Sequence, residues 1–232
     1  MKKMKFYQAG YYLIKINKAD YGSIKNRELM TASDCINDSY FDSWSFSWAI
    51  DGKEKSKIAK EIGLTEEKIE HLQKWVDDKL ELNKIGWQNI FYSLEELNEY
   101  KSEYFKNRND LITLGLSFSE TELEDVIEEF KPQKDKVGEI GIRYALRQRK
   151  AENINGKFIG YDVIGIELGG SFHTIHCHDL ESELTNKFKI EFFTNGLVKS
   201  CKDWKKITDY CNDESNGLEP VPWFYCKVKL YE

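Results

Sequence analysis

The alternation of apolar and polar residues along the chain predicts several short strands. They are indicated where apolar, β-branched and aromatic residues lie between turn-forming residues. The last is the clearest, because its apolar residues recur at every second position from Phe224 to Leu230. The expected strands are residues 1–17, 111–118, 161–168, 172–177, 188–193 and 224–230.

Helices are predicted where apolar residues recur every three or four positions behind a capping residue. Ser93 with Glu96, and Ser119 with Glu122, form capping-box patterns, and Gly63 is placed to end a helix. The expected helices are residues 53–62, 65–80, 93–104, 119–130, 140–150, 179–188 and 200–211.

The order of these elements predicts an α+β fold, in which a mostly antiparallel sheet is flanked by helices. Most of the expected strands come from the C-terminal half, and a helical insertion occupies about residues 53–106 of the N-terminal half. No repeat, low-complexity tract or linker rich in Gly, Ser or Pro marks a boundary. We therefore expect residues 1–232 to form a single domain or, at most, two lobes (1–131 and 132–232) that share one core.

The composition indicates a folded globular protein with an acidic surface. Of the 232 residues, 41% are hydrophobic and 14% are aromatic, which excludes a disordered chain. A formal net charge of −6 argues against binding to nucleic acid or to an anionic membrane, because those partners select basic surfaces. No run approaches the roughly 18 apolar residues of a membrane span. The partner that this charge favours is a basic protein.

The cysteines and the N-terminus predict free thiols in a cytoplasmic protein. The apolar run at the N-terminus is interrupted by Gln8 and Lys15 and lacks a small-residue cleavage site, so we do not expect a secretion signal. An odd number of cysteines, far apart in the sequence, favours reduced thiols. The five are Cys35, Cys177, Cys201, Cys211 and Cys226.

Residues 158–188 contain the densest group of chemically active side chains. Three of the four histidines fall within six positions there, beside a cysteine and an aspartate: His173, His176, Cys177, His178 and Asp179. If residues 172–177 form a regular strand, His176 and His178 face one side and His173 faces the other. The three imidazoles could then not reach one metal ion. His176 and His178 could still bind a catalytic zinc with Asp179 or a distant carboxylate as the third ligand.

The alternative interpretation is that these histidines are structural and that the protein has no cofactor. Histidines at a strand end beside a helix N-terminus are commonly hydrogen-bonded within the fold. The sequence has no H-E-x-x-H motif and no paired C-x-x-C motif. It also lacks a G-x-S-x-G elbow, a G-x-x-x-x-G-K-[ST] loop and a dinucleotide fingerprint. An enzymatic role would therefore depend on the histidine cluster.

Two acidic segments are candidates for a partner-binding surface. In residues 31–51, aspartates alternate with aromatic residues and no basic residue lies among them. Such a segment is either pinned to the core by its rings or binds a basic protein. The helix after Ser119 is expected to present acidic residues outward, Glu122 among them, although such a run can be an ordinary solvated face or can pair with the basic helix at 140–150. The expected partner-binding residues are Asp34, Asp38, Asp42, Trp44, Trp48, Asp51, Glu120, Glu124 and Glu128.

Three patterns in the C-terminal half carry a resemblance to a known family. They are G-Y-D-V-I-G-I-E-L-G-G-S-F-H at residues 160–173, N-G-L at 195–197 and E-P-V-P-W-F at 219–224. Over about residues 138–230 the chain resembles small bacterial immunity proteins of polymorphic and contact-dependent toxin systems. The resemblance implies a cytoplasmic protein that binds one cognate toxin, occludes its active site and has no chemistry of its own. The run T-I-H-C-H at residues 174–178 departs from that pattern, which leaves a metal-related role open.

Two hypotheses from different classes follow. The first is an immunity-type protein that neutralises a basic cognate toxin through its acidic surface. The second is a metal-dependent hydrolase, or a metal-binding protein, centred on His173, His176 and His178.

Overall fold

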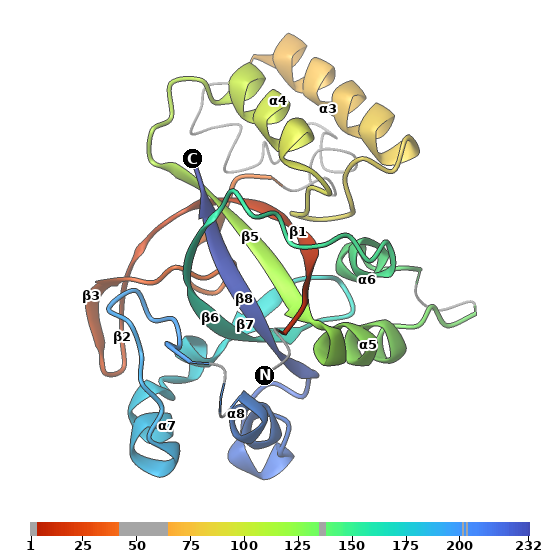
Figure 1. The fold of residues 1–232 in the computed structure, drawn as a ribbon. Coiled ribbons are helices and arrows are strands. Elements are labelled where there is room, and N and C mark those ends of the chain that lie inside the picture. The colour runs from red at the N-terminus through yellow and green to blue at the C-terminus, as the bar shows by residue number, and fades with distance from the viewer. Residues whose placement is uncertain (1–3, 42–64, 135–137, 201, 203) are drawn as a thin grey trace.

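The computed structural model describes residues 4–41, 65–134, 138–200, 202 and 204–232, and in them the predicted α+β fold is confirmed. The main sheet is strongly curled, and its six strands are antiparallel in the order β4-β1-β5-β8-β6-β7 (Figure 1). These strands are β1 (Phe6–Lys15), β4 (Asp38–Ser39), β5 (Leu111–Ser119), β6 (Lys157–Ile166), β7 (Phe172–Thr174) and β8 (Trp223–Tyr231). A separate hairpin, which the sequence pattern did not predict, pairs β2 (Lys18–Tyr21) with β3 (Ile24–Glu28).

Helices cover the sheet at both ends and on one side. In Figure 1, α3 and α4 lie across one end, α5 and α6 pack side by side, and α7 and α8 lie at the opposite end with the β2–β3 hairpin. The α-helices of the described residues are α3 (Glu66–Glu81), α4 (Leu94–Tyr104), α5 (Glu120–Glu129), α6 (Gly141–Arg147), α7 (Glu181–Phe188) and α8 (Trp204–Cys211). Two short 3-10 helices are η1 (Ile175–His178) and η2 (Glu214–Asn216).

The expected helix starts are confirmed where a hydroxyl side chain caps the helix. Thr65, Ser93 and Ser119 each accept a hydrogen bond from the backbone N–H three residues later, which satisfies a donor that the first turn leaves without a helical partner. The predicted helical insertion is present as α3 and α4, between β4 and β5. The helix expected at residues 53–62 lies outside the described residues.

The two halves of the chain interleave in one sheet. β1, β4 and β5 come from residues 1–131 and β6, β7 and β8 from residues 132–232, so the expectation that most strands belong to the C-terminal half is wrong for the described residues. The last strand, β8, pairs with β5 on one side and with β6 on the other. The segments 1–131 and 132–232 therefore share a continuous set of backbone hydrogen bonds.

The strand expected at residues 188–193 is also wrong. α7 continues to Phe188, and Lys189 ends it with a left-handed φ of 59°. Beyond that point only an isolated bridge joins Phe192 to Val198, across the predicted turn at Asn195-Gly196. Val198 exchanges backbone hydrogen bonds with Tyr161 of β6. Residues 189–198 therefore pair with the main sheet through this isolated bridge and do not add a strand to it.

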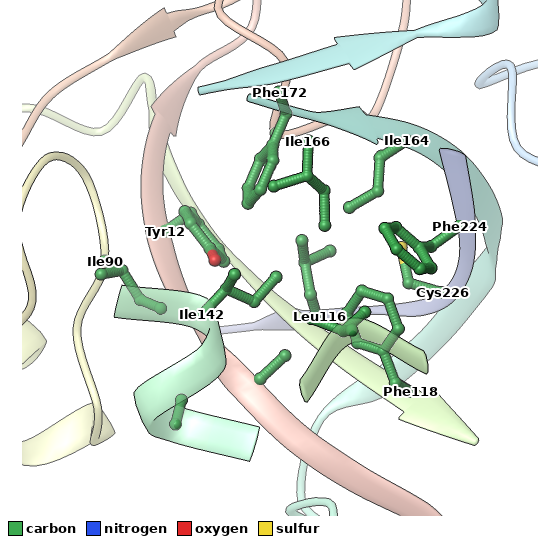
Figure 2. Packing of buried hydrophobic residues seen from close by; sticks show 14 of the residues in the cluster. Tyr12, Ile90, Leu116, Phe118, Ile142, Ile164, Ile166, Phe172, Phe224 and Cys226 are labelled. Carbon is green, nitrogen blue, oxygen red and sulfur yellow. The ribbon is translucent and has the colours of Figure 1, made fainter. Parts of the chain in front are cut away.

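The apolar core lies on both faces of the sheet. Inside the curl, side chains from the strands meet α5 and α6, with Ile142 of α6 reaching toward Tyr12 and Leu116 (Figure 2). A second cluster joins β1 and β5 to α3 and α4, and a third joins β6 and β8 to α7 and α8. Burial on both faces explains why β1 and β5 are nearly continuous apolar runs.

We expect Gly10→Ala to destabilise the fold. Gly10 sits where the β1–β5 register shifts, with a φ of 141°, and an added Cβ would lie 2.5 Å from Ile90 Cγ1. Strain and overlap together should lower the free energy of unfolding by about 1–3 kcal/mol, measured by urea denaturation. Gly138→Ala is the matched control, because no atom of the described residues lies within 4 Å of its added Cβ. Equal stability of the two variants would contradict the prediction.

Candidate functional site

The clustered histidines do not lie on a regular strand. β7 ends at Thr174, and the chain then turns into the 3-10 helix η1. Because a 3-10 helix repeats every three residues and a strand every two, the expected division of His173 from His176 and His178 by strand faces is wrong. The orientation of each imidazole is instead set by the groups that contact it.

Asp179 does not cap α7, and its carboxylate is hydrogen-bonded to Ser23. It follows η1 with a left-handed φ of 56°, and Leu180 is the residue before α7. Its carboxylate accepts a 2.8 Å hydrogen bond from the Ser23 amide and a second bond from the Ser23 hydroxyl. These bonds lower the pKa of Asp179 and hold the β2–β3 hairpin against η1.

His176 is buried and bonded within the fold. Its side chain is 2% exposed, and Nε2 lies 2.9 Å from the Gly196 carbonyl oxygen. Gly196 allows this approach, because an added Cβ would lie 2.8 Å from that nitrogen. Nδ1 lies 3.7 Å from Glu181 Oε2, the oxygen that also accepts a 2.7 Å hydrogen bond from Arg27. His176 therefore joins the turn at Gly196 to α7.

A buried carboxylate lies beside His176. Burial raises the pKa of Asp162, whereas hydrogen bonds from the Thr31 and Thr174 hydroxyls and the charge of His176 oppose that rise. Thr31 donates at 2.7 Å and Thr174 at 3.2 Å. The network connects the segment after β3 to β6 and β7, so it fixes where residues 31–37 lie.

The other two histidines converge on Glu219. His178 Nε2 pairs with Glu219 Oε2, and its ring meets Trp223 edge-on at 6.0 Å. His173 Nδ1 lies 3.8 Å from Glu219 Oε1. Glu219 therefore faces both rings from the segment that precedes β8.

His173 also lies between a thiol and a second carboxylate. Its Nδ1 is 3.4 Å from Cys35 Sγ, and its Nε2 is 2.7 Å from Glu167 Oε1. Cys35 is exposed, whereas the His173 side chain is only 13% exposed. Cys35 is 138 positions from His173 in the sequence, whereas Glu167 is only six positions from it, so the fold brings the thiol to an imidazole and carboxylate that are already near each other in the chain. No motif links Cys35 to His173, so sequence reasoning missed this group.

The structure does not bring the proposed zinc ligands together. His176 and Asp179 are bonded to Gly196 and Ser23 respectively. Over the residues that the structure describes, no group of three or more His, Cys, Asp or Glu side chains is arranged to hold a metal ion. The four described cysteines, Cys35, Cys177, Cys211 and Cys226, are free thiols, and Cys201 lies outside the described residues.

The predicted acidic surface is divided between two places. Asp34 is exposed and Asp38 is half-buried on β4, beside Lys15 at one end of β1. Ser119, which caps α5, pairs with Phe6 at the other end of β1, roughly 30 Å away along the strand. Asp42, Trp44, Trp48 and Asp51 lie outside the described residues.

α5 carries an exposed acidic face that neighbouring basic residues partly neutralise. Glu120, Glu124 and Glu128 are exposed on it. Glu124 pairs at 2.6 Å with Arg149, just after α6, as expected if the acidic and basic helices pair. Glu128 pairs with Lys131.

Glu122 is not part of that face, contrary to expectation. It is 3% exposed, because the third position of the helix points toward β8, where its Oε2 accepts a 2.8 Å hydrogen bond from the Tyr225 amide. Burial raises the pKa of Glu122 to about 7. The Ser119 hydroxyl caps the helix, but this carboxylate binds the sheet and does not complete the capping box.

The fold and the geometry above define an α+β protein with an acidic helix and a cysteine–histidine–glutamate group. No described helix is long and apolar enough to cross a membrane. Comparison of the chain with models of protein families, with curated proteins and with solved structures found no match in any of the three.

We expect His176→Ala to lower the free energy of unfolding by about 2–4 kcal/mol, because it leaves a cavity and removes the bond to the Gly196 carbonyl. Urea denaturation measures the effect, and the control is His71→Ala, at an exposed position of α3. A chelator should leave the melting temperature of the wild-type protein unchanged. Stoichiometric zinc in the purified protein, lost in the variant, would contradict the structural role.

We expect Glu122→Gln to change how stability depends on pH. With its folded pKa raised to about 7 from 4.5, the folded state retains a proton that the unfolded state has lost, so wild-type stability falls as pH rises through this range. The variant lacks this penalty but can still accept the Tyr225 bond. Its stability relative to wild type should rise by about 3 kcal/mol between pH 4.5 and 7.5 in urea denaturation series. A constant difference would show that Glu122 titrates normally.

Proposed function

We propose that this protein is an immunity-type protein that binds and neutralises a basic cognate bacterial toxin by covering its active site. The resemblance at residues 160–173, 195–197 and 219–224 suggests this class. The net charge of −6 favours a basic partner. The proposal places the protein in the cytoplasm, where such a toxin would act.

The observation that carries the proposal is the exposed acidic face of α5. Its carboxylates lie on a helix whose opposite side is anchored by Leu123 and Val126, both fully buried in the core. Charges held on a rigid helix keep their positions when a partner approaches. Binding therefore does not carry the entropic cost of ordering a flexible loop. The exposed acids of this face are Glu120, Glu124, Asp125, Glu128 and Glu129.

Such a face acts mainly on the rate of association. A cluster of like charges on an already acidic protein attracts a cationic partner before contact, and this attraction is screened by salt. Glu124 pairs with Arg149 beyond α6, so its replacement would also disturb the contact between the two helices. Glu128 pairs with Lys131 three residues along the chain and Glu120 lies 3.5 Å from the Tyr7 hydroxyl, so we choose these two positions for the test. The second acidic group comprises Asp34 and Asp38, of which Asp38 pairs with Lys15 at the other end of β1, and it can be tested separately.

We expect Glu120→Lys with Glu128→Lys to slow association about tenfold or more at low salt and to flatten its salt dependence. The partner to test is the purified product of the reading frame immediately upstream, where the resemblance places a toxin gene. Association rates come from biolayer interferometry at several salt concentrations. Co-expression with the toxin measures loss of protection.

The matched control is Glu95→Lys with Glu103→Lys on α4, which makes the same change in net charge at exposed positions on a different helix. If the control slows association as much as the α5 variant, only the overall charge matters and α5 is not the interface. A larger effect of Asp34→Lys with Asp38→Lys would place the interface at the β4 end. Absence of binding by the wild-type protein would overturn the proposal for that partner.

A further inference from the structure

We propose that Cys35 is a nucleophilic thiol activated by His173, and that it reduces hydroperoxides with Cys177 as the second, resolving thiol. This activity goes beyond toxin binding and does not depend on it. Three features carry the proposal: the position of the imidazole, the second thiol beside the first, and the difference in exposure between the two thiols.

The geometry around His173 suits a general base. Because a carboxylate only accepts hydrogen bonds, we assign the ring proton to Nε2, which donates to Glu167 Oε1 at 2.7 Å. The lone pair of Nδ1 is then directed at Cys35 Sγ, 3.4 Å away. A carboxylate that orients an imidazole toward a nucleophile is the arrangement that activates thiols and hydroxyls in enzymes. Glu219 Oε1, 3.8 Å from the same Nδ1, adds negative charge that stabilises the imidazolium formed when the thiol proton moves.

The second thiol lies beside the first, and Ser33 contacts both residues. Ser33 Oγ is 3.8 Å from Cys177 Sγ and accepts a 3.3 Å hydrogen bond from the Cys35 amide. Burial, together with a hydrogen bond to the Cys35 thiol, raises the pKa of Cys177 to about 12. Cys177 therefore remains a protonated, half-buried thiol, and the exposed Cys35 is the one that a dissolved reactant meets first.

The same turn argues against acyl transfer as the chemistry. That reaction needs backbone N–H groups free to bind an oxyanion beside the nucleophile. The amide of Cys35 donates to Ser33 Oγ, and the amides of Ile36 and Asn37 both donate to the Ser33 carbonyl. A hydroperoxide requires no such site, because its leaving oxygen can take a proton from His173.

The reaction proceeds in two steps, oxidation of Cys35 and then formation of a disulfide with Cys177. The Cys35 proton moves to His173 Nδ1, and the thiolate attacks the terminal oxygen of ROOH. The O–O bond breaks, Cys35 becomes a sulfenic acid, and RO⁻ takes the proton from His173 and leaves as ROH. Cys177 then attacks the sulfenic sulfur, so that an S–S bond forms and water leaves with the Cys177 proton. Two thiols lose two electrons and the hydroperoxide gains them, and a small-molecule thiol can restore the dithiol.

The first experiment measures alkylation of Cys35 by iodoacetamide at pH 7, with peptide mapping by mass spectrometry. We expect the wild-type thiol to react roughly tenfold faster than free cysteine, of which only a few per cent is thiolate at that pH. His173→Asn should remove the advantage, so that the rate follows the titration of a free cysteine as pH rises. Glu167→Gln should reduce this rate advantage by a smaller factor. The Glu167 side chain is 46% exposed, so this variant should stay folded.

Controls separate this effect from a loss of structure. His71→Asn on α3 changes a histidine that lies outside the site and contacts Tyr104, and it should leave the rate unchanged. The buried thiols of Cys211 and Cys226 should stay unlabelled in every variant, which reports that the core is intact. Equal alkylation rates in wild type, His173→Asn and Glu167→Gln would overturn the proposed base.

The second experiment adds one equivalent of hydrogen peroxide to the reduced protein of residues 1–232. We expect a Cys35–Cys177 disulfide in the wild type, no reaction at Cys177 in Cys35→Ser, and a persistent Cys35 sulfenic acid, trapped by dimedone, in Cys177→Ser. A trapped sulfenic acid in the wild type with no disulfide would overturn the role of Cys177. Oxidation of Cys35 no faster than that of free cysteine would overturn the activity itself.

Discussion

Pairing of the last strand, β8, between β5 and β6 is the constraint on which the rest of the structure depends. Its side chains are buried on both faces. Phe224 and Cys226 point into the curl of the sheet (Figure 2), and Trp223 and Tyr225 pack with α7 and α8. β5 and β8 are more than a hundred residues apart, so neither half of the chain can bury its apolar faces before the other is present. The acidic helix and the histidines are both attached to this one sheet.

The segment 31–37 is held in place by polar contacts that leave it little freedom. Thr31 donates to the buried Asp162, and Ser33 donates to the Phe172 carbonyl at 2.8 Å. The Asn37 amide group donates to two carbonyls of the preceding chain. Buried polar groups that are all bonded specify one arrangement, because each lost bond would leave an uncompensated group. The hydrogen bonds that fix the segment 31–37 therefore also hold Cys35 beside His173. The chemistry of that pair depends on these contacts.

The two proposals concern different places and different kinds of chemistry. Binding to a basic protein depends on the field of many carboxylates, which is long-ranged and weakened by salt. Thiol activation depends on three side chains in contact, and salt should affect it little. Asp34 is next to Cys35 in the chain, whereas Glu120 and Glu128 lie toward the other end of β1. Variants at α5 and variants at the thiol therefore report on separate properties of the protein.

The sequence by itself determined those helices and strands that are specified by residues close together in the chain. The hydroxyl caps at Thr65, Ser93 and Ser119, and the alternation from Phe224 to Leu230, predicted helices and a strand that are present, because a cap and a strand period depend on neighbours within a few residues. Sequence also located the histidine cluster. Tertiary structure decided the order of the strands, the burial of Glu122, the 3-10 turn that redirects the histidines, and the meeting of Cys35, His173 and Glu167. Those features depend on contacts between residues far apart in the chain, and no short pattern in the sequence records them.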